Sequence, residues 1–515
     1  MALRRLLFAA VLLATMLVPV VAAQASSNQE SIMMDDDLLL HRGENVRTSS
    51  LVRMSQLGVD TVRVSVLWRT VAQGANLTSA EIKRIRSASA RKRARKQRAR
   101  FRGSNPRTYP PLNWDRYDNL VADAARLNLK VYFTITGPGP KFAHRKAPRG
   151  QRRNSNTYKP IPSRFRAFAK AVGKRYSGGY TDENTTKQRL PRVSMWSLWN
   201  EPNQAGWLSP QWERRGGKRV PASPSLYRQL YAAGRGGLAS SGHNGDVILL
   251  GETAPLGSSG RGPRSSLRPA MFLRELARGK TSLRATGFAH HAYTKRLPPT
   301  TPSSRAGDLT LANLGALGTL LDRLASQSGG RIPAGLPIWI TEFGYESNPP
   351  DPRNGISLTS QADFNQRGEF LAYGNPRVPG FTQFLLRDAG PLKRFKKNSR
   401  NYWFTYQSGL FTVKGQAKPA ASAYLLPFVA NKAGANVSFW GQLRFRPNGA
   451  ADTARIQWRP SAQAPWAQLG GPIQTSPRGH FTATSLAPSP TAEFRAVYVN
   501  PANGQIVAES LPAKP

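Results

Sequence analysis

Cysteine is absent from this chain of 515 residues. Disulfides, catalysis by a thiolate and metal sites built on cysteine are therefore excluded. The fold must be held by burial of a core, which a chain of this length can supply. Because the length exceeds that of one ordinary core, we expect one large domain with a smaller one attached.

Acidic residues are scarce relative to basic ones. The chain has 28 Asp and Glu against 74 Lys and Arg, a formal net charge of +46. This charge favours anionic partners such as nucleic acid, membrane surfaces, acidic polysaccharides or an anionic cell-wall polymer, but it says nothing about the fold. An arginine-rich composition in solvated loops is the simpler explanation.

The densest basic cluster lies in residues 91–100, within a segment that we interpret as an insertion near residues 86–104. It has no interleaved aromatic residues and matches no nucleic-acid-binding module. We therefore expect no nucleic-acid partner.

Apolar runs long enough to enter a membrane are missing after the N-terminus. Two arginines and an apolar run up to Val21 precede small residues at Ala23 and Ala25. This pattern is typical of a secretory signal peptide. We assign residues 1–25 to it and predict a secreted protein with no membrane span after cleavage. An uncleaved anchor is the alternative.

Residues 30–428 alternate short β-rich runs with amphipathic stretches. The expected strands end near Leu39, Trp68, Thr136, Asn200, Gly251, His291, Phe343 and Leu386. The expected helices span residues 49–57, 114–127, 162–176, 224–240, 270–277, 309–326, 360–373 and 418–426. Eight such units favour parallel pairing in a (β/α)8 barrel. A doubly wound sheet is the alternative, but its phosphate-binding glycine pattern is incomplete.

The periodicity changes to two after about residue 428. Val437–Phe445, Ala454–Trp458 and Phe494–Val499 alternate in this way, and turn residues such as Arg446–Gly449 separate them. We expect a small antiparallel β-sandwich over residues 429–515. The fold class is thus α/β, a TIM barrel followed by a sandwich.

Two glutamates close strands of the expected barrel. Pro202 cannot donate to a sheet ladder, so the strand before it ends and leaves Glu201 at its carboxyl end. Glu342 closes the seventh strand in the same way, and barrel active sites lie at this face. Two facing carboxylates are what glycosidic cleavage requires. Taken alone, each could instead form a salt bridge.

The motifs around these glutamates resemble a known family. Trp199-Asn-Glu-Pro-Asn203 and Trp339-Ile-Thr-Glu-Phe-Gly344 are similar to the acid/base and nucleophile motifs of clan A retaining glycoside hydrolases, especially the cellulase-like family 5 and the β-xylosidase-like family 39. The likeness covers about residues 32 to 428. It implies that Glu201 is the general acid/base, that Glu342 is the nucleophile and that Asn200 bonds the sugar 2-hydroxyl.

The resemblance extends to two further strands. Residues 61–68 are similar to the clan's second strand, which implies that Arg63 supports the nucleophile. His291-Ala-Tyr293 is similar to the sixth, which implies that Tyr293 bonds the nucleophile and that His291 lines the sugar site. No cofactor is implied. Adjacent His290 and His291 cannot both point inward, so we expect no metal site.

Two more site residues are interpreted from their positions at strand ends. Trp68 is a candidate for stacking on a sugar, with ordinary packing between loop and barrel as the alternative. Glu252 is a rival to the two catalytic carboxylates, and we expect it to bind substrate. The chain departs from the clan at strand eight, where Phe381–Asp388 lacks the tryptophan that many members use as a sugar platform. The sequence therefore does not predict which sugar is bound.

The resulting hypothesis is a secreted glycosidase that cleaves β-glycosidic bonds of a poly- or oligosaccharide with retention of configuration. The alternative is a non-catalytic carbohydrate- or cell-wall-binding protein on a degenerate barrel. The presence of both Glu201 and Glu342 argues against this alternative.

Overall fold

The computed structural model describes residues 26, 28–184, 186–444 and 452–515. The proposed signal peptide, residues 1–25, and the turn at 446–449 lie outside the described residues. No helix of the described part is both long and apolar enough to cross a membrane.

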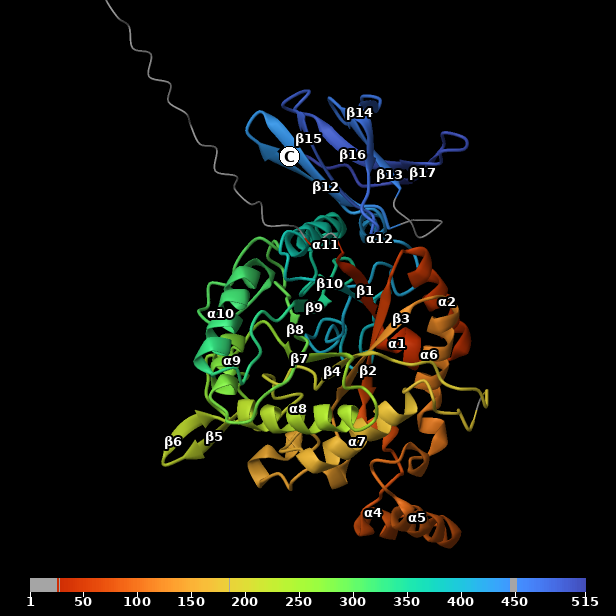
Figure 1. The fold of residues 1–515 in the computed structure, drawn as a ribbon, viewed down its shortest axis with the longest axis vertical. Coiled ribbons are helices and arrows are strands. Elements are labelled where there is room, and N and C mark those ends of the chain that lie inside the picture. Colours follow the sequence, from red (N-terminus) through yellow and green to blue (C-terminus); the bar gives the residue numbers. More distant parts are fainter. Residues whose placement is uncertain (1–25, 27, 185, 445–451) are drawn as a thin grey trace, which may run out of the picture.

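Eight parallel strands close into a barrel (Figure 1). In order around the barrel they are β1 (Glu30–Met34), β2 (Thr61–Leu67), β3 (Lys130–Thr136), β4 (Met195–Leu198), β7 (Val247–Thr253), β8 (Gly287–His291), β9 (Ile338–Phe343) and β10 (Gly380–Phe384). Strand β10 pairs with β1, with Glu30 opposite Gly380. The predicted barrel is confirmed, and a doubly wound open sheet is excluded.

Each strand is followed by one helix that corresponds to a predicted one, and additional helices follow β1 and β2. In chain order the corresponding helices are α2 (Glu44–Gln56), α6 (Asp115–Arg126), α7 (Pro162–Arg175), α8 (Ser223–Ala239), α9 (Pro269–Ala277), α10 (Leu314–Gln327), α11 (Leu358–Tyr373) and α12 (Pro419–Leu425). Helix α6 shows why they form, because Tyr117, Leu120, Val121 and Ala124 recur on one face and are buried. Proline in the first turn starts α7, α9 and α12.

The predicted end of the first strand near Leu39 is wrong. Strand β1 stops at Met34, and Asp36–Leu40 form the short helix α1. The side chain of Asp35 caps this helix by accepting from the Leu38 backbone nitrogen at 3.1 Å. Aspartate is a poor strand residue and a good N-cap, so the Asp35–Asp37 run favours a helix start.

The C-terminal part is a sandwich of two antiparallel sheets, as predicted. One sheet holds β11 (Phe428–Ala433), β12 (Asn436–Gln442) and β15 (His480–Leu486). The other holds β14 (Ala467–Gln474), β13 (Thr453–Arg459), β16 (Glu493–Val499) and β17 (Ile506–Glu509). Their inner faces bury a core that includes Phe428, Phe439, Ile456, Phe481 and Phe494.

The sandwich packs on the amino-terminal end of the barrel. Arg444 Nε donates to Ser31 Oγ in β1 at 2.8 Å, and Arg478 Nη1 pairs with Asp60 Oδ1 before β2 at 2.6 Å. Figure 1 places the sandwich and the basic helix α5 (Ala88–Arg100) at opposite ends of the molecule. The carboxyl end of the barrel is therefore left uncovered by the sandwich.

Candidate active site

Both predicted glutamates lie at the carboxyl end of the barrel. Strand β4 ends at Leu198, and Trp199 and Glu201 then have φ values of 77° and 38°. Left-handed backbone is uncommon for such residues and clusters at functional sites. The break in the strand explains how Asn200 and Glu201, adjacent in sequence, can both reach the mouth.

Glu201 and Glu342 face each other across a narrow gap. One oxygen of each carboxylate and a ring nitrogen of His291 all lie within 4.8 Å of one another. The Glu201 side chain is 21% exposed and that of Glu342 is 11% exposed. The pair is thus reachable from solvent, with Glu201 on the more open side.

Arg63 is a hydrogen-bond and ion-pair partner of Glu342. Its Nη1 donates to Glu342 Oε1 at 2.8 Å, and its Nη2 donates to Asn200 Oδ1 at 3.3 Å. The guanidinium is fully buried. Burial would lower the pKa of Arg63, but the charges of Glu252 and Glu342 raise it above its usual value. Arg63 is therefore a permanent cation that stabilises the carboxylate of Glu342.

Tyr293 fixes the second oxygen of Glu342. Its hydroxyl donates to Glu342 Oε2 at 3.0 Å, while its ring meets the Phe384 ring edge-on at 6.1 Å. With Arg63 on one oxygen and Tyr293 on the other, the carboxylate has one fixed orientation.

His291 bridges three carboxylates. Its Nδ1 lies 3.0 Å from Glu201 Oε1 and 3.4 Å from Glu342 Oε2, and its Nε2 lies 2.8 Å from Glu252 Oε2. Burial would lower the pKa of His291, but the charge of Glu342 and the bonds to Glu201 and Glu252 raise it to about 10. The ring is therefore an imidazolium near neutral pH, and both nitrogens donate.

Glu201, His291 and Glu342 are also the group of described residues that has the spacing of metal ligands. A metal ligand must offer a free lone pair, and an imidazolium has none. In the structure the trio is a hydrogen-bonded cluster, and a metal ion bound there would have to displace the His291 proton.

The predicted role of Glu252 in substrate binding is wrong, because the residue is not accessible to a substrate. Its side chain is fully buried, and it accepts from Tyr132, from Ser197 Oγ at 2.5 Å and from Thr341 Oγ1 at 2.6 Å. Burial would raise the pKa of Glu252, but the charge of Arg63 and the bonds from His291 and Ser197 hold it well below its usual value. Glu252 is a buried anion that positions Arg63 and His291.

The predicted role of Trp68 as a sugar-stacking residue is also wrong. It begins the short helix α3 (Trp68–Val71), and its side chain is 1% exposed. The ring stacks on Phe168 of α7 at 5.5 Å and contacts Phe165. Because the ring is covered by the core, it cannot stack on a sugar.

Tyr406 is a site residue that the sequence did not indicate. It is 56% exposed, and its ring meets Phe384 edge-on at 5.2 Å. Burial and the charges of Glu201 and Glu342 raise the pKa of Tyr406 above its usual value, and its ring shares the neighbour Phe384 with Tyr293. Tyr406 follows β10 by a long irregular segment, so no strand-end pattern marks it.

Comparisons with known proteins give structural matches. No protein-family model matches the chain, and no curated protein matches it. A family 39 glycoside hydrolase from Bacteroides cellulosilyticus WH2 is similar in structure, with 13% identity, a TM-score of 0.47 and coverage of 92% of this chain and 81% of that one. A glucosidase from Croceicoccus marinus gives 12% identity, a TM-score of 0.48 and coverage of 92% and 96%.

The GH5_18 protein from Streptomyces cattleya is also similar, with 17% identity, a TM-score of 0.44 and coverage of 78% of this chain and 79% of that one. These neighbours are glycoside hydrolases, including the two families that the motifs resemble. The fold of this chain follows from its own strand order, and its chemistry follows from the side chains at the mouth.

Proposed function

We propose that the protein is an exported glycoside hydrolase that cleaves β-glycosidic bonds of a poly- or oligosaccharide by a retaining mechanism. The observation that carries this proposal is the separation of the two carboxylates, with oxygens of Glu201 and Glu342 within 4.8 Å. Retaining enzymes hold their carboxyl groups about 5–5.5 Å apart, whereas inverting enzymes need about 6.5–9.5 Å to admit a water molecule.

In the first step, Glu342 attacks the anomeric carbon while Glu201 gives a proton to the leaving oxygen. The bond from Glu342 forms as the glycosidic bond breaks, which leaves a covalent glycosyl-enzyme and a deprotonated Glu201. The hydrogen bonds from Arg63 and Tyr293 support the attacking carboxylate in one orientation.

In the second step, Glu201 takes a proton from water, and the water displaces Glu342 from the sugar. Two displacements restore the original configuration. The greater exposure of Glu201 suits this exchange with water. Asn200 is oriented through its oxygen by Arg63, so its amide NH2 can donate to a sugar hydroxyl.

The charge balance supports an acid among these groups. Arg63 and His291 contribute two positive charges against the carboxylates of Glu201, Glu252 and Glu342. The cluster becomes neutral when one carboxylate carries a proton. Glu201, the most exposed of the three, is the carboxylate that can exchange that proton with solvent. A non-catalytic barrel would not require two facing carboxylates together with the charged residues that orient them.

The test uses activated aryl β-glycosides. Glu342→Gln should abolish hydrolysis, and azide should restore turnover to Glu201→Ala and give a glycosyl azide of retained configuration. Glu275→Gln, which changes a carboxylate on the outer helix α9, should keep the parent rate. If Glu342→Gln turned over as fast as the parent, the assignment would be wrong.

Export rests on the N-terminal sequence alone. An arginine pair, an apolar run and small residues precede Ala25. N-terminal sequencing of protein collected from the culture medium of an expressing cell should begin close to this position. An intact Met1 on cell-retained protein would contradict export.

A further inference from the structure

The loops after β2 and β3 are far more basic than the rest of the chain. Residues 68–114 and 137–161 together hold 20 Lys and Arg but a single acid, Glu81, whereas the whole chain has 74 against 28. Both loops leave the carboxyl end of the barrel, where the catalytic carboxylates lie. The excess charge is therefore concentrated beside the candidate active site.

These two loops enclose a cavity of about 530 Å³. Its lining includes Leu67, Arg69, Pro138, Phe142 and Asn156. Ligand sites have volumes of about 300–1,000 Å³, with few polar groups placed among apolar ones. This cavity has such a volume, although seven of its fifteen lining residues are polar or charged, and the cleavage mechanism does not use it.

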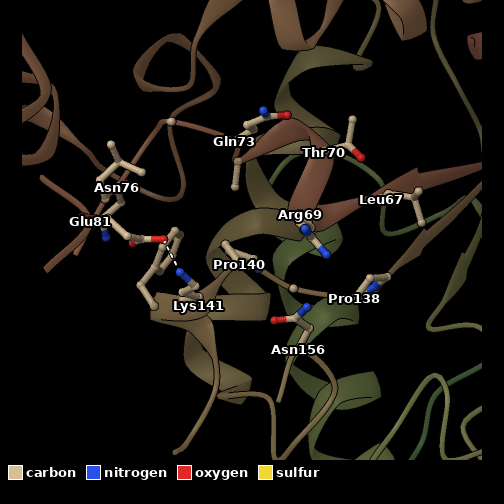
Figure 2. A pocket seen from close by; sticks show the side chains of 15 residues that line it. Leu67, Arg69, Thr70, Gln73, Asn76, Glu81, Pro138, Pro140, Lys141 and Asn156 are labelled. Carbon is tan, nitrogen blue, oxygen red and sulfur yellow. Dashed lines mark hydrogen bonds and ion pairs between the residues drawn. The ribbon is translucent and has the colours of Figure 1, made fainter. Parts of the chain in front are cut away.

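Arg69 is the uncompensated charge of the cavity. Figure 2 shows Arg69 near Pro138 and Asn156, while the Glu81–Lys141 ion pair lies on the other side. Burial would raise the pKa of Glu81, but the bonds from Lys141 and Thr78 hold it at about 2, so Glu81 stays ionised and neutralises Lys141. Among the described residues, no hydrogen bond or ion pair engages the guanidinium of Arg69.

The cavity lies beside the active site along strand β2. Leu67 and Arg63 share a face of β2, and four residues of strand separate them by about 13 Å. The Trp199 ring packs so closely on Gly137 that a Cβ there would lie 2.8 Å from it. Gly137, next to the cavity-lining Pro138, therefore contacts the segment that carries Glu201. A separation of about 13 Å suits a later unit of the same sugar chain.

Helix α5 flanks this cavity. Its C-terminal neighbour Phe101 packs on Phe142 of the cavity wall with ring centroids 5.5 Å apart. Arg98 Nη1 donates to Ser79 Oγ at 2.7 Å, which ties α5 to α4 (Ser79–Lys83), the helix that carries Glu81. No residue of α5 is buried, and seven of its thirteen residues are Lys or Arg.

We propose that the substrate is an acidic polysaccharide, that the cavity is a subsite for one of its anionic units, and that α5 extends this subsite into a cationic track for the same chain. The inference rests on the proposed function and names its substrate class. Arg69 would bind the carboxylate or sulfate of the unit, since a guanidinium matches such groups with paired hydrogen bonds.

Other polyanions fit this surface less well. Proteins that hold single-stranded nucleic acid stack bases on aromatic side chains, and α5 has none. A helix that lies on a membrane needs an apolar face with residues such as Leu, Phe or Trp, and α5 lacks these as well.

The test measures binding by the full chain carrying Glu342→Gln, so that no turnover occurs. The probes are β-1,4-linked polyglucuronate oligomers and the same oligomers fully methyl-esterified, which share a backbone and differ in charge. At 150 mM salt we expect the acid form to bind at least tenfold more tightly. Equal binding of the two forms would overturn the inference.

Two variants locate the binding surface. Arg69→Gln, and separately Lys92→Gln with Arg95→Gln and Lys96→Gln, should each weaken binding of the acid form at least fivefold. The matched control, Arg274→Gln with Lys280→Gln and Arg323→Gln, removes the same charge from the exposed surface near α9 and α10 and should leave binding within twofold. An equal loss in the control would mean that net charge alone binds the polymer, and would overturn the subsite.

A 20-base-pair DNA duplex completes the test. Tighter binding of the duplex than of the acid oligomer, with the same loss in Arg69→Gln, would make this surface a nucleic-acid site and overturn the inference. The two proposals fail separately. Hydrolysis of neutral aryl glycosides without charge-selective binding refutes only the substrate class, whereas charge-selective binding in a parent that cleaves no glycoside refutes the proposed function.

Discussion

The barrel mouth and helix α5 both concentrate cations, but in opposite surroundings. Arg63 is fully buried and bonds to Asn200 and Glu342, whereas Lys92, Arg95 and Lys96 are exposed on a helix with no acidic residue. The free-energy contribution of a buried charge depends on the exact positions of its partners. Exposed charges act together through their summed electrostatic field, to which each one contributes little. Single changes should therefore be severe at the mouth and mild on α5.

The largest effect is expected for Glu252→Gln. This change leaves Arg63 and His291 without the buried anion that balances them. Removing one partner of a buried ion pair costs about 3–5 kcal/mol. Urea denaturation should show a loss of that size.

The matched control is Glu509→Gln, which breaks the ion pair with Arg495 on the sandwich surface, where the Glu509 side chain is 55% exposed. Surface pairs contribute about 0–1 kcal/mol. Similar losses in the two variants would contradict the distinction between the regions.

Arg63→Lys should come next. Lysine keeps the charge but cannot donate to Asn200 and Glu342 from one planar group. Loss of one preorganised donor costs about 100- to 1000-fold in turnover, and kcat measured on an aryl glycoside should fall by that amount. Arg93→Lys on α5 should change kcat less than twofold, so a parent-like rate for Arg63→Lys would count against the role of Arg63.

The pH dependence of stability should report on His291. Its pKa is raised to about 10 from an ordinary 6.5, so the stabilisation is fully present below pH 6.5 and is lost as the pH rises toward 10. The free energy of unfolding should therefore fall more steeply over this window in the parent than in His291→Gln. A difference between the two proteins that stays constant from pH 6.5 to 10 would show that His291 is not charged in the folded state.

The smallest effect on stability is expected at α5. Replacing residues 88–100 with a short Gly-Ser linker removes no buried residue. We expect the melting temperature to change by less than about 4 °C, since about 1 kcal/mol shifts it by 2–4 °C in a domain of 150–250 residues. Loss of the cooperative transition would show that the helix supports the barrel.

Sequence periodicity was enough to predict the barrel, because each strand–helix unit repeats the same local pattern. It could not place the first strand end, since the capping preference of Asp35 overrides the apolar run Leu38–Leu40 that follows. Strand ends also identified the two carboxylates at the mouth.

The side to which a residue points was harder to predict. Trp68 and Glu252 both close strands, yet Trp68 turns into the core and Glu252 lies beneath the cluster. His291 joins Glu201, Glu252 and Glu342, which are 90, 39 and 51 residues away in sequence. Such contacts depend on closure of the barrel and on the backbone conformation of single residues, such as Glu252 with a φ of 49°. A local sequence pattern predicts neither of these.

The most direct test of the account is the anomeric configuration of the first sugar released. Proton NMR of an aryl β-glycoside undergoing hydrolysis separates the two anomers before they equilibrate. Oxygens of Glu201 and Glu342 lie within 4.8 Å of each other, close to the spacing of retaining enzymes. The proposed mechanism therefore predicts that the β-anomer appears first. Initial release of the α-anomer would contradict the two-step mechanism at this pair.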